Sequence, residues 1–107
     1  MAELSEGATA HVELVGRTDE ATTIAISGEI DISNDERVRS AIERCLDPRP
    51  NRLVIDLRDL SFMDSSGIAV LLRAASDIDR VELHHATRAV RRIIETTGID
   101  GVLHLEA

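Results

Sequence analysis

The stretch RLVIDLRDLSFMDSSGIAVLLRAA, residues 52–75, decides how this chain folds. Residues 53–57 are apolar and rich in β-branched side chains, interrupted only by Asp56, a pattern typical of a strand buried on both faces in a parallel sheet. After a short polar turn, apolar residues recur at helical spacing at positions 68, 71, 72, 75 and 78. The stretch therefore predicts a buried strand, a turn, and a helix that begins at about Ser65 or Ser66.

The turn Asp64-Ser65-Ser66-Gly67 places two hydroxyl groups at the start of that helix. Asp64 or Ser65 is the expected N-cap, because its side-chain oxygen can accept one of the first unpaired backbone N–H groups. A helix start also carries a partial positive charge, which stabilises an anion such as a phosphate beside it. The serines therefore have two interpretations, as helix caps only or as a phosphorylation site.

Composition restricts the classes of function. The chain has 107 residues, enough for one domain with one core, and a net charge of −8. All 12 basic residues are arginine and they are scattered along the chain, so we expect no nucleic-acid partner. The N-terminus does not resemble a secretory signal, and no apolar segment approaches the ~18 residues of a membrane span. We therefore expect a cytoplasmic protein without membrane insertion.

The single cysteine, Cys45, is interpreted as a small buried hydrophobic residue.

The order of the elements predicts one α/β domain. Residues 1–7 are expected to form a flexible tail and residues 8–107 the folded domain. Strands are expected at residues 10–15, 22–27, 52–57, 81–84 and 102–105. The first two strands form an antiparallel hairpin, and helices follow the later strands in the order β-β-α-β-α-β-α-β. This order requires a mixed, mainly parallel sheet with helices packed against it.

Local signals mark the ends of the outer helices. Ser33 and Glu36 fit a capping box, with Ser33 as the N-cap and Glu36 at the third helical position. Thr87 is the expected cap of the last helix. Gly98 stands where a left-handed residue ends a helix, and Ile99 supplies the hydrophobic contact that usually follows.

Loops that follow parallel strands leave the sheet at one edge, where ligands and partners usually bind. Residues 28–33, 60–67 and 84–87 are the expected loops of this kind. We therefore predict that Asp31, Asp64 and Ser66 lie close together, although they are far apart in the sequence. The edge would be acidic, with exposed hydroxyl groups.

Catalytic interpretations of this edge find little support. A serine hydrolase would use Ser66 as the nucleophile and His85 as its base, but Asp64 stands where a small residue is needed and would repel an oxyanion. Asp31, Asp64 and His85 match no known metal-ligand spacing. The chain contains neither lysine nor a glycine-rich phosphate loop, so an ATP site would have to come from another protein. We expect no enzymatic activity, no metal and no cofactor.

Small apolar residues lie beside the main apolar stripe of the central helix, at Ala69, Val70 and Ala74. One interpretation is packing against a neighbouring helix. The other is a docking patch for a partner, in which Ala69, one turn beyond Ser66, would make the contact.

The sequence resembles the STAS domain family, which contains sulfate transporters and anti-sigma factor antagonists, and in particular the stand-alone bacterial antagonists. Three segments carry the resemblance: GEID at residues 28–31, LVIDLRDLSFMDSSGIAVLL at 53–72 and AVRRIIETTGIDGVLHL at 89–105. In that family the second serine of the Asp-Ser-Ser-Gly motif is phosphorylated, which implies Ser66 here. The aspartate of the Gly-Glu-x-Asp segment, Asp31 here, lies beside it.

The resemblance implies a partner-switching cycle. The unphosphorylated chain would bind an anti-sigma factor that is also a serine kinase, and so free a sigma factor. Phosphorylation of Ser66 would reverse the binding, and a PP2C-like phosphatase would reset the cycle. The residues expected to contact the partner are Asp31, Asp64, Ser65, Gly67 and Ala69. The family also contains scaffold subunits of stress-signalling complexes and soluble subunits of lipid-transport ATPase complexes, which remain the alternative. The oligomeric state stays open.

Overall fold

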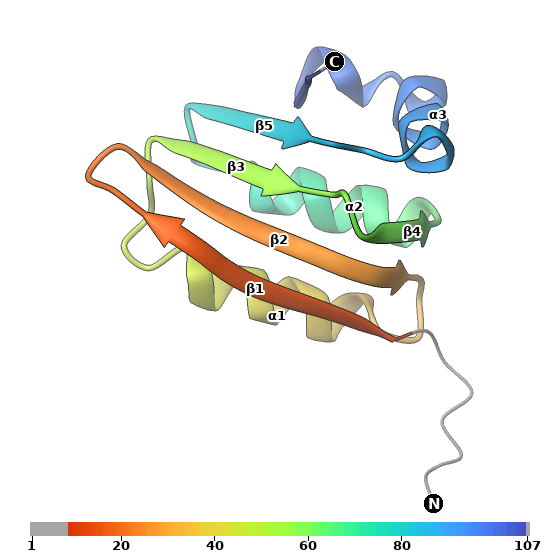
Figure 1. Ribbon diagram of the computed structural model, residues 1–107, viewed down its shortest axis with the longest axis horizontal. Helices are drawn as coiled ribbons and strands as arrows, with labels where there is room; N and C mark the ends of the chain where they lie inside the picture. The colour runs from red at the N-terminus through yellow and green to blue at the C-terminus, as the bar shows by residue number, and fades with distance from the viewer. Residues whose placement is uncertain (1–8, 107) are drawn as a thin grey trace, which may run out of the picture.

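A mixed six-stranded sheet with two helices against one face forms the body of the protein (Figure 1). The structure is a computed structural model that describes residues 9–106, so the tail predicted at residues 1–7 lies outside the described residues. The elements in chain order are β1 (Ala10–Arg17), β2 (Ala21–Ile30), α1 (Asp35–Cys45), β3 (Arg52–Asp56), β4 (Leu60–Met63), α2 (Ser65–Ala74), β5 (Arg80–His84), α3 (Arg88–Thr97), the 3-10 helix η1 (Ile99–Gly101) and β6 (His104–Leu105).

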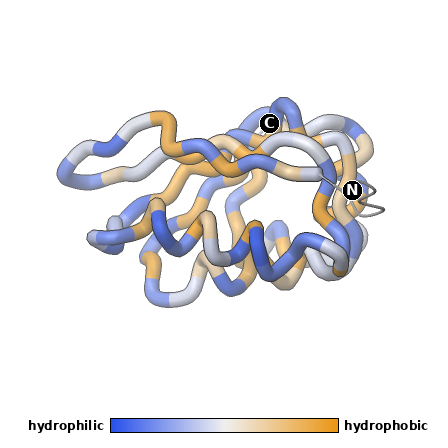
Figure 2. The backbone as a smooth tube through the Cα atoms, turned by 90° about the horizontal axis from the view of Figure 1, so that it is seen from below, coloured by the Kyte–Doolittle hydropathy of each residue, from blue (hydrophilic) through white to orange (hydrophobic). Residues whose placement is uncertain are grey.

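The strand order confirms the predicted α/β architecture. The main path of the sheet is β1-β2-β3-β5-β6, with β1 antiparallel to β2 and the other pairs parallel. Helices α1 and α2 lie side by side against one face, so that sheet and helices form two layers (Figure 2). Helix α3 lies beyond the end of β5 and packs beside β4 (Figure 1). No helix in the described part of the chain is long and apolar enough to cross a membrane.

One strand was not expected from the sequence. Residues 60–63, predicted as part of a loop, form β4, which pairs with the second half of β2 from Gly28↔Leu60 to Ile30↔Met63. The chain leaves β3 after Asp56, and the next backbone N–H, that of Leu57, donates to the carbonyl of His84 at 2.8 Å. The strand has only four residues, and its two middle residues are both exposed, so it lacks the alternation that predicts a strand.

The core lies between the sheet and the helices and is aliphatic, as Ile24, Leu53 and Leu83 illustrate at 0% exposure. In α2 the buried stripe differs from the prediction. Val70 and Ala74 are buried, whereas Leu72 is 38% exposed. Because α2 packs against α1 as well as the sheet, its buried face is wider than one stripe. Packing against a neighbouring helix therefore explains Val70 and Ala74.

The helix ends confirm some local signals and correct others. Thr87 caps α3, accepting the Val90 N–H at 3.2 Å, and Gly98 ends it with a left-handed φ of 78°. The predicted cap of α1 is wrong, because the N-cap is Asn34 and the hydroxyl of Ser33 instead donates to Asp31 Oδ1 at 2.5 Å. The backbone there makes a turn, with the Asn34 N–H donating to the Asp31 carbonyl at 3.1 Å, and α1 therefore begins two residues after Ser33.

Two smaller corrections concern the ends of elements. The expected strand at residues 102–105 is shortened to β6, because the chain first makes the turn of η1. Cys45 is half-buried rather than buried, since it is the last residue of α1, and it packs against the edge of the core.

Candidate functional site

The turn between β4 and α2 is built around Asp64. Its backbone N–H donates to the carbonyl of Ile30 at 3.2 Å, and its carboxylate accepts the Ser66 N–H at 2.8 Å. Its carbonyl accepts the N–H groups of Gly67 and Ile68 at 3.0 and 3.2 Å. Asp64 is therefore the N-cap of α2, as one of the two predicted alternatives, and it ties the start of the helix to the end of β2.

The residues after Asp64 differ in exposure. Ser65 is exposed and Ser66 is half-buried, so both hydroxyl groups lie in the first turn of α2 at or near the surface. Gly67 is buried, and a Cβ at this position would lie 2.6 Å from the Cβ of Met63. The glycine thus lets the first turn of α2 approach the end of β4, which is a packing role.

Asp31 lies next to this turn, because the hydrogen bond between Ile30 and Asp64 joins the ends of β2 and β4. Its carboxylate accepts both the backbone N–H and the hydroxyl of Ser33, at 2.8 and 2.5 Å. The structure therefore places Asp31, Asp64 and Ser66 at one edge of the sheet, as the topology predicts. The loop with His85 leaves β5 at the same edge (Figure 1), and His85 is exposed.

Apolar side chains border this edge. Ile32 is 80% exposed just beyond the end of β2, and Phe62, the only aromatic residue of the chain, is 44% exposed on β4. Ala69 is also exposed on α2, one turn beyond Ser66. Exposed apolar residues are ordinary on a protein surface, and these three lie within three residues of Asp31, Asp64 or Ser66 in the chain.

A groove between α1 and α2 begins at Ser66. It has a volume of about 100 Å³ and is lined by Asp35, Glu36, Arg39, Ser66, Ala69, Val70 and Arg73. Arg39 donates to Glu36 at 2.9 Å, and this hydrogen bond, with the opposite charges, lowers the pKa of Glu36 and raises the pKa of Arg39. Sequence reasoning missed both arginines. Ser66, Ala69 and Arg73 lie at spacings i, i+3 and i+7, which would have placed Arg73 on the same face of α2.

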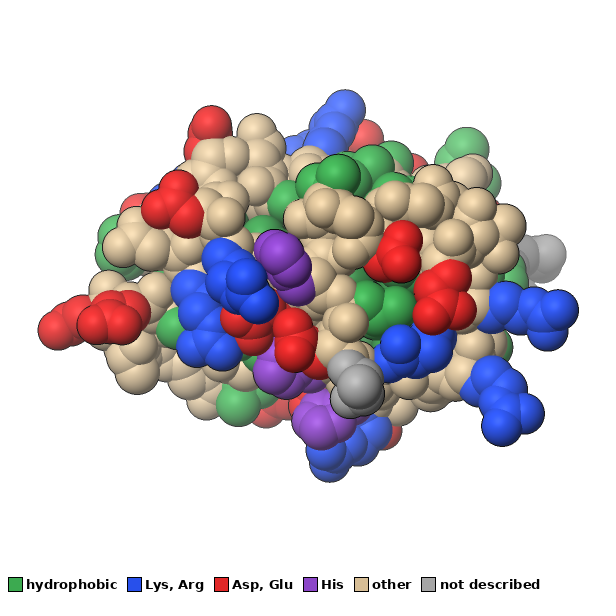
Figure 3. All heavy atoms as spheres, turned by 90° about the horizontal axis from the view of Figure 1, so that it is seen from above, with side chains coloured by type: hydrophobic (Ala, Val, Ile, Leu, Met, Phe, Trp, Pro, Cys, Tyr) green, Lys and Arg blue, Asp and Glu red, His purple; other side chains and the backbone are tan. Residues whose placement is uncertain are grey.

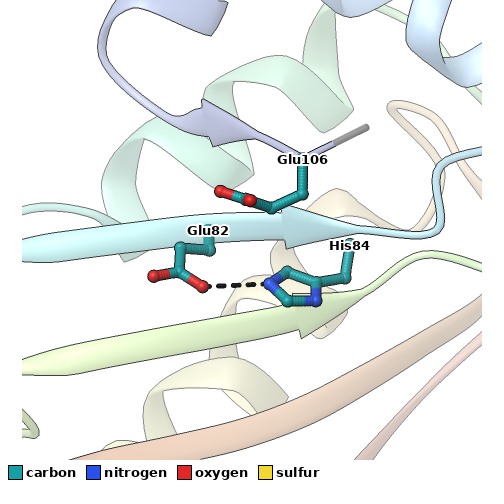
Figure 4. A group of neighbouring side chains, drawn as sticks. All are labelled: Glu82, His84 and Glu106. Atoms are coloured by element: carbon teal, nitrogen blue, oxygen red, sulfur yellow. Dashed lines mark hydrogen bonds and ion pairs between the residues drawn. The ribbon is translucent and has the colours of Figure 1, made fainter.

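A second polar cluster lies on the face of the sheet opposite α1 and α2, where Glu82, His84 and Glu106 approach one another (Figure 4). Glu82 is only 5% exposed and accepts hydrogen bonds from Arg52 at 2.9 Å, Arg80 at 2.6 Å and His84 at 2.9 Å. Arginine, acidic and histidine side chains gather on the surface in the view from above (Figure 3).

This cluster holds the side chains of a possible metal site, but its charges favour a structural role. The hydrogen bonds from Arg52, then those from Arg80 and His84, lower the pKa of Glu82 far below its ordinary value of 4.5. A divalent cation would have to displace two guanidinium groups that already neutralise this carboxylate. His84 thus has a structural role here, joined through Glu82 to Arg52 on the neighbouring strand β3.

Known proteins of similar sequence share one family. Residues 13–105 match the family described as "Mlab, STAS domain". A STAS-domain containing protein of Pseudomonas aeruginosa (strain UCBPP-PA14) is 30% identical over 82 residues, which cover 73% of this chain and 80% of that protein. The anti-sigma-B factor antagonist of Listeria monocytogenes serovar 1/2a is 26% identical over 99 residues, which cover 89% of this chain and 87% of that protein.

A solved structure agrees with these relatives. The crystal structure of an anti-sigma factor antagonist from Mycobacterium paratuberculosis superposes with a TM-score of 0.72 at 29% identity, covering 92% of this chain and 85% of that one. The match to the family runs from within β1 through the Asp64 turn to the last strand. The chain therefore belongs to the STAS domain family, and within that family it is similar to anti-sigma factor antagonists.

Proposed function

We propose that this protein is an anti-sigma factor antagonist regulated by phosphorylation of Ser66. The observation that carries the proposal is the position of Ser66, half-buried in the first turn of α2, beside Asp31 and Asp64 at the edge of the sheet. The similarity to anti-sigma factor antagonists supplies the class of partner. The chain itself catalyses no reaction in this proposal and acts in the cytoplasm.

In the unphosphorylated state, the edge around Ser66 binds an anti-sigma factor that is also a serine kinase, and a sigma factor is released. The exposed apolar side chains of Ile32, Phe62 and Ala69 supply area for this contact, and Ser65 adds a hydroxyl group. Protein interfaces combine buried apolar area with hydrogen-bonding polar groups, and this edge offers both. Gly67 positions the turn between β4 and α2, because it packs closely on Met63.

The kinase then transfers the γ-phosphoryl group of ATP to the oxygen of Ser66, with ADP as the leaving group. The phosphate adds a charge of about −1.5 to −2 at an edge that already holds two carboxylates. The backbone N–H groups at the start of α2 stabilise an anion there, so the fold does not need to rearrange. A loss of only ~3 kcal/mol of binding free energy weakens docking more than a hundredfold. A PP2C-like phosphatase restores the starting state.

The proposal is tested by incubating the protein with ATP and candidate anti-sigma factor kinases and locating the phosphate by mass spectrometry. Native protein and a Ser65→Ala control should gain one phosphate on Ser66, whereas Ser66→Ala should gain none. Calorimetry should show that Ser66→Ala still binds the kinase, while the phosphorylated protein does not. Transfer to another residue, or equal affinity of both forms, would contradict the proposal and favour a subunit role in a larger signalling or transport complex.

A further inference from the structure

The groove between α1 and α2 brings two arginines to the side of α2 on which Ser66 lies. Arg73 follows Ser66 by seven residues, or about 10 Å along the helix axis. Helical side chains lean towards the N-terminus of their helix, which turns the long Arg73 side chain back towards Ser66. Arg39 reaches the same groove from α1, because α1 and α2 pack side by side.

Arg39 has donors to spare. Its Nη2 donates to Glu36 Oε1 at 2.9 Å, but its Nε is buried and has no hydrogen-bond partner among the residues that the structure describes. A guanidinium group has five N–H donors in a fork that fits two oxygens of one phosphate. The pair with Glu36 is also easily given up, since the Glu36 side chain is 78% exposed and water can solvate it.

We infer that a phosphate on Ser66 is bound inside this groove by Arg39, which exchanges Glu36 for the phosphate, with Arg73 contacting it from the other end. The inference rests on the proposed function, because it needs Ser66 to carry the phosphate. The groove has about 100 Å³ of space, well above the ~10–15 Å³ that one water molecule needs by the same measure. A phosphoryl group attached at its end therefore has room to enter.

Binding in the groove gives the modification a defined form. The phosphate is held on the α1 side of Ser66 instead of turning freely in solvent, and Glu36 is released as a second exposed negative charge. A partner that docked on Ser65 and Ala69 would then meet both charges at fixed positions. Arg39 and Arg73 fix the position of the phosphate in this way. The backbone N–H groups at the start of α2 would stabilise its charge without directing it into the groove.

The test needs no kinase, because phosphoserine can be inserted at position 66 during protein synthesis by an expanded genetic code. A pH titration followed by ³¹P NMR then measures the second pKa of the phosphate, which is about 6 without neighbours. Native protein should show a pKa lower by at least ~0.5 unit than the Arg39→Gln variant, because a nearby guanidinium favours the doubly charged phosphate. Asp31, Asp35, Asp64 and Glu36 remain in both proteins and act in the opposite direction.

Arg37→Gln is the matched control, since it removes the same charge from an exposed position of α1 that does not line the groove. It should leave the phosphate pKa within ~0.2 unit of native, whereas Arg73→Gln should raise it by an intermediate amount. A second readout needs no arginine substitution and compares the chain with and without phosphoserine at position 66. The Arg39 Nε–H resonance should shift and exchange more slowly with water when Ser66 carries the phosphate.

Equal phosphate pKa values in the Arg39→Gln and Arg37→Gln proteins, or an unchanged Arg39 Nε–H resonance, would place the phosphate in solvent and overturn the inference. That failure is distinct from failure of the proposed function. The proposed function fails when a kinase transfers no phosphate to Ser66, whereas the inserted phosphoserine is present whatever the kinase does.

Discussion

At the scale of single residues, Gly67 shows how one missing side chain positions the site. A Cβ there would lie 2.6 Å from the Cβ of Met63, so the first turn of α2 could not lie this close to β4. We expect Gly67→Ala to lower the free energy of unfolding by about 1–3 kcal/mol, the usual effect of overpacking. Urea denaturation measures this change.

The control for that substitution is Gly101→Ala, because a Cβ at Gly101 meets no atom within 4 Å. It should change the free energy of unfolding by less than about 0.5 kcal/mol. If both alanine variants unfolded at the same urea concentration as the native chain, the close approach of Gly67 to Met63 would not contribute to the free energy of unfolding.

Glu82 is the residue that links stability to pH. Its folded-state pKa lies far below the 4.5 of a free glutamate, because Arg52, Arg80 and His84 all donate to it. The stabilisation from this ion cluster is therefore fully present above about pH 4.5 and is lost as the pH falls below that value. In this range Glu82 becomes protonated in the unfolded chain but stays ionised in the folded chain. Below about pH 4.5 the loss reaches at most ~1.4 kcal/mol per pH unit.

We accordingly expect Glu82→Gln to be less stable than the native chain near neutral pH by about 1.5–3 kcal/mol, as for the loss of a hydrogen-bonded charge. The difference should shrink as the pH falls below about 4.5. Urea denaturation at several pH values measures it. The exposed Glu95, 3.9 Å from Arg91, provides the control Glu95→Gln, which should cost no more than ~0.5 kcal/mol. A gap between native and Glu82→Gln that stayed constant down to acid pH would refute this account.

At the scale of elements, one face of α2 packs in the core and the other is exposed to a partner. Val70 and Ala74 are buried, whereas Ser65 and Ala69 are exposed, and Ala69 also lines the groove. We expect Ala69→Arg to weaken binding of the anti-sigma factor kinase at least tenfold, since a long charged side chain would stand in the docking surface. The free energy of unfolding should stay within about 0.5 kcal/mol of native, because the position is exposed.

Titration calorimetry with the kinase measures this effect, and Ala89→Arg is the matched control. Ala89 is an exposed alanine near the start of α3, and the same substitution there should leave kinase binding unchanged. Full affinity of the Ala69→Arg protein would remove α2 from the interface.

At the scale of the whole molecule, the sheet brings the ends of β2 and β4 and the start of α2 to one edge, and the switch needs no change of fold. We expect Ser66→Asp to bind the kinase at least tenfold more weakly than Ser66→Ala, because only aspartate adds a charge at the docking surface. Amide chemical shifts of the two variants should differ around that edge and in α1, and agree in β1 and β6.

Equal affinity of these two variants would rule out the electrostatic mechanism. Ser76→Asp serves as the positional control, since it places the same charge at an exposed serine beyond the opposite end of α2, and it should leave kinase binding unchanged. Shift differences spread over the entire sheet would instead indicate a conformational switch.

The predictable part of this protein is local or topological. The buried strand at residues 53–57, the helix after Asp64 and the cap of α3 at Thr87 depend on neighbours within a few positions, so they could be identified in advance, with Asp64 as one of two candidate caps of α2. The proximity of Asp31 to Asp64 followed from a rule about parallel sheets. Local signals failed where the turn after β2 used Asn34 in place of the capping serine, Ser33.

What the sequence by itself determined is the order of strands and helices apart from β4, and the edge at which Ser66 lies, because spacing and capping act along the chain. Only the tertiary structure decided that β4 completes β2, that Arg39 and Arg73 meet at one groove, and that Glu82 gathers its three donors. The physical reason is that helix packing and strand register set these contacts between residues distant in the chain, and no periodicity or cap within one segment encodes that geometry.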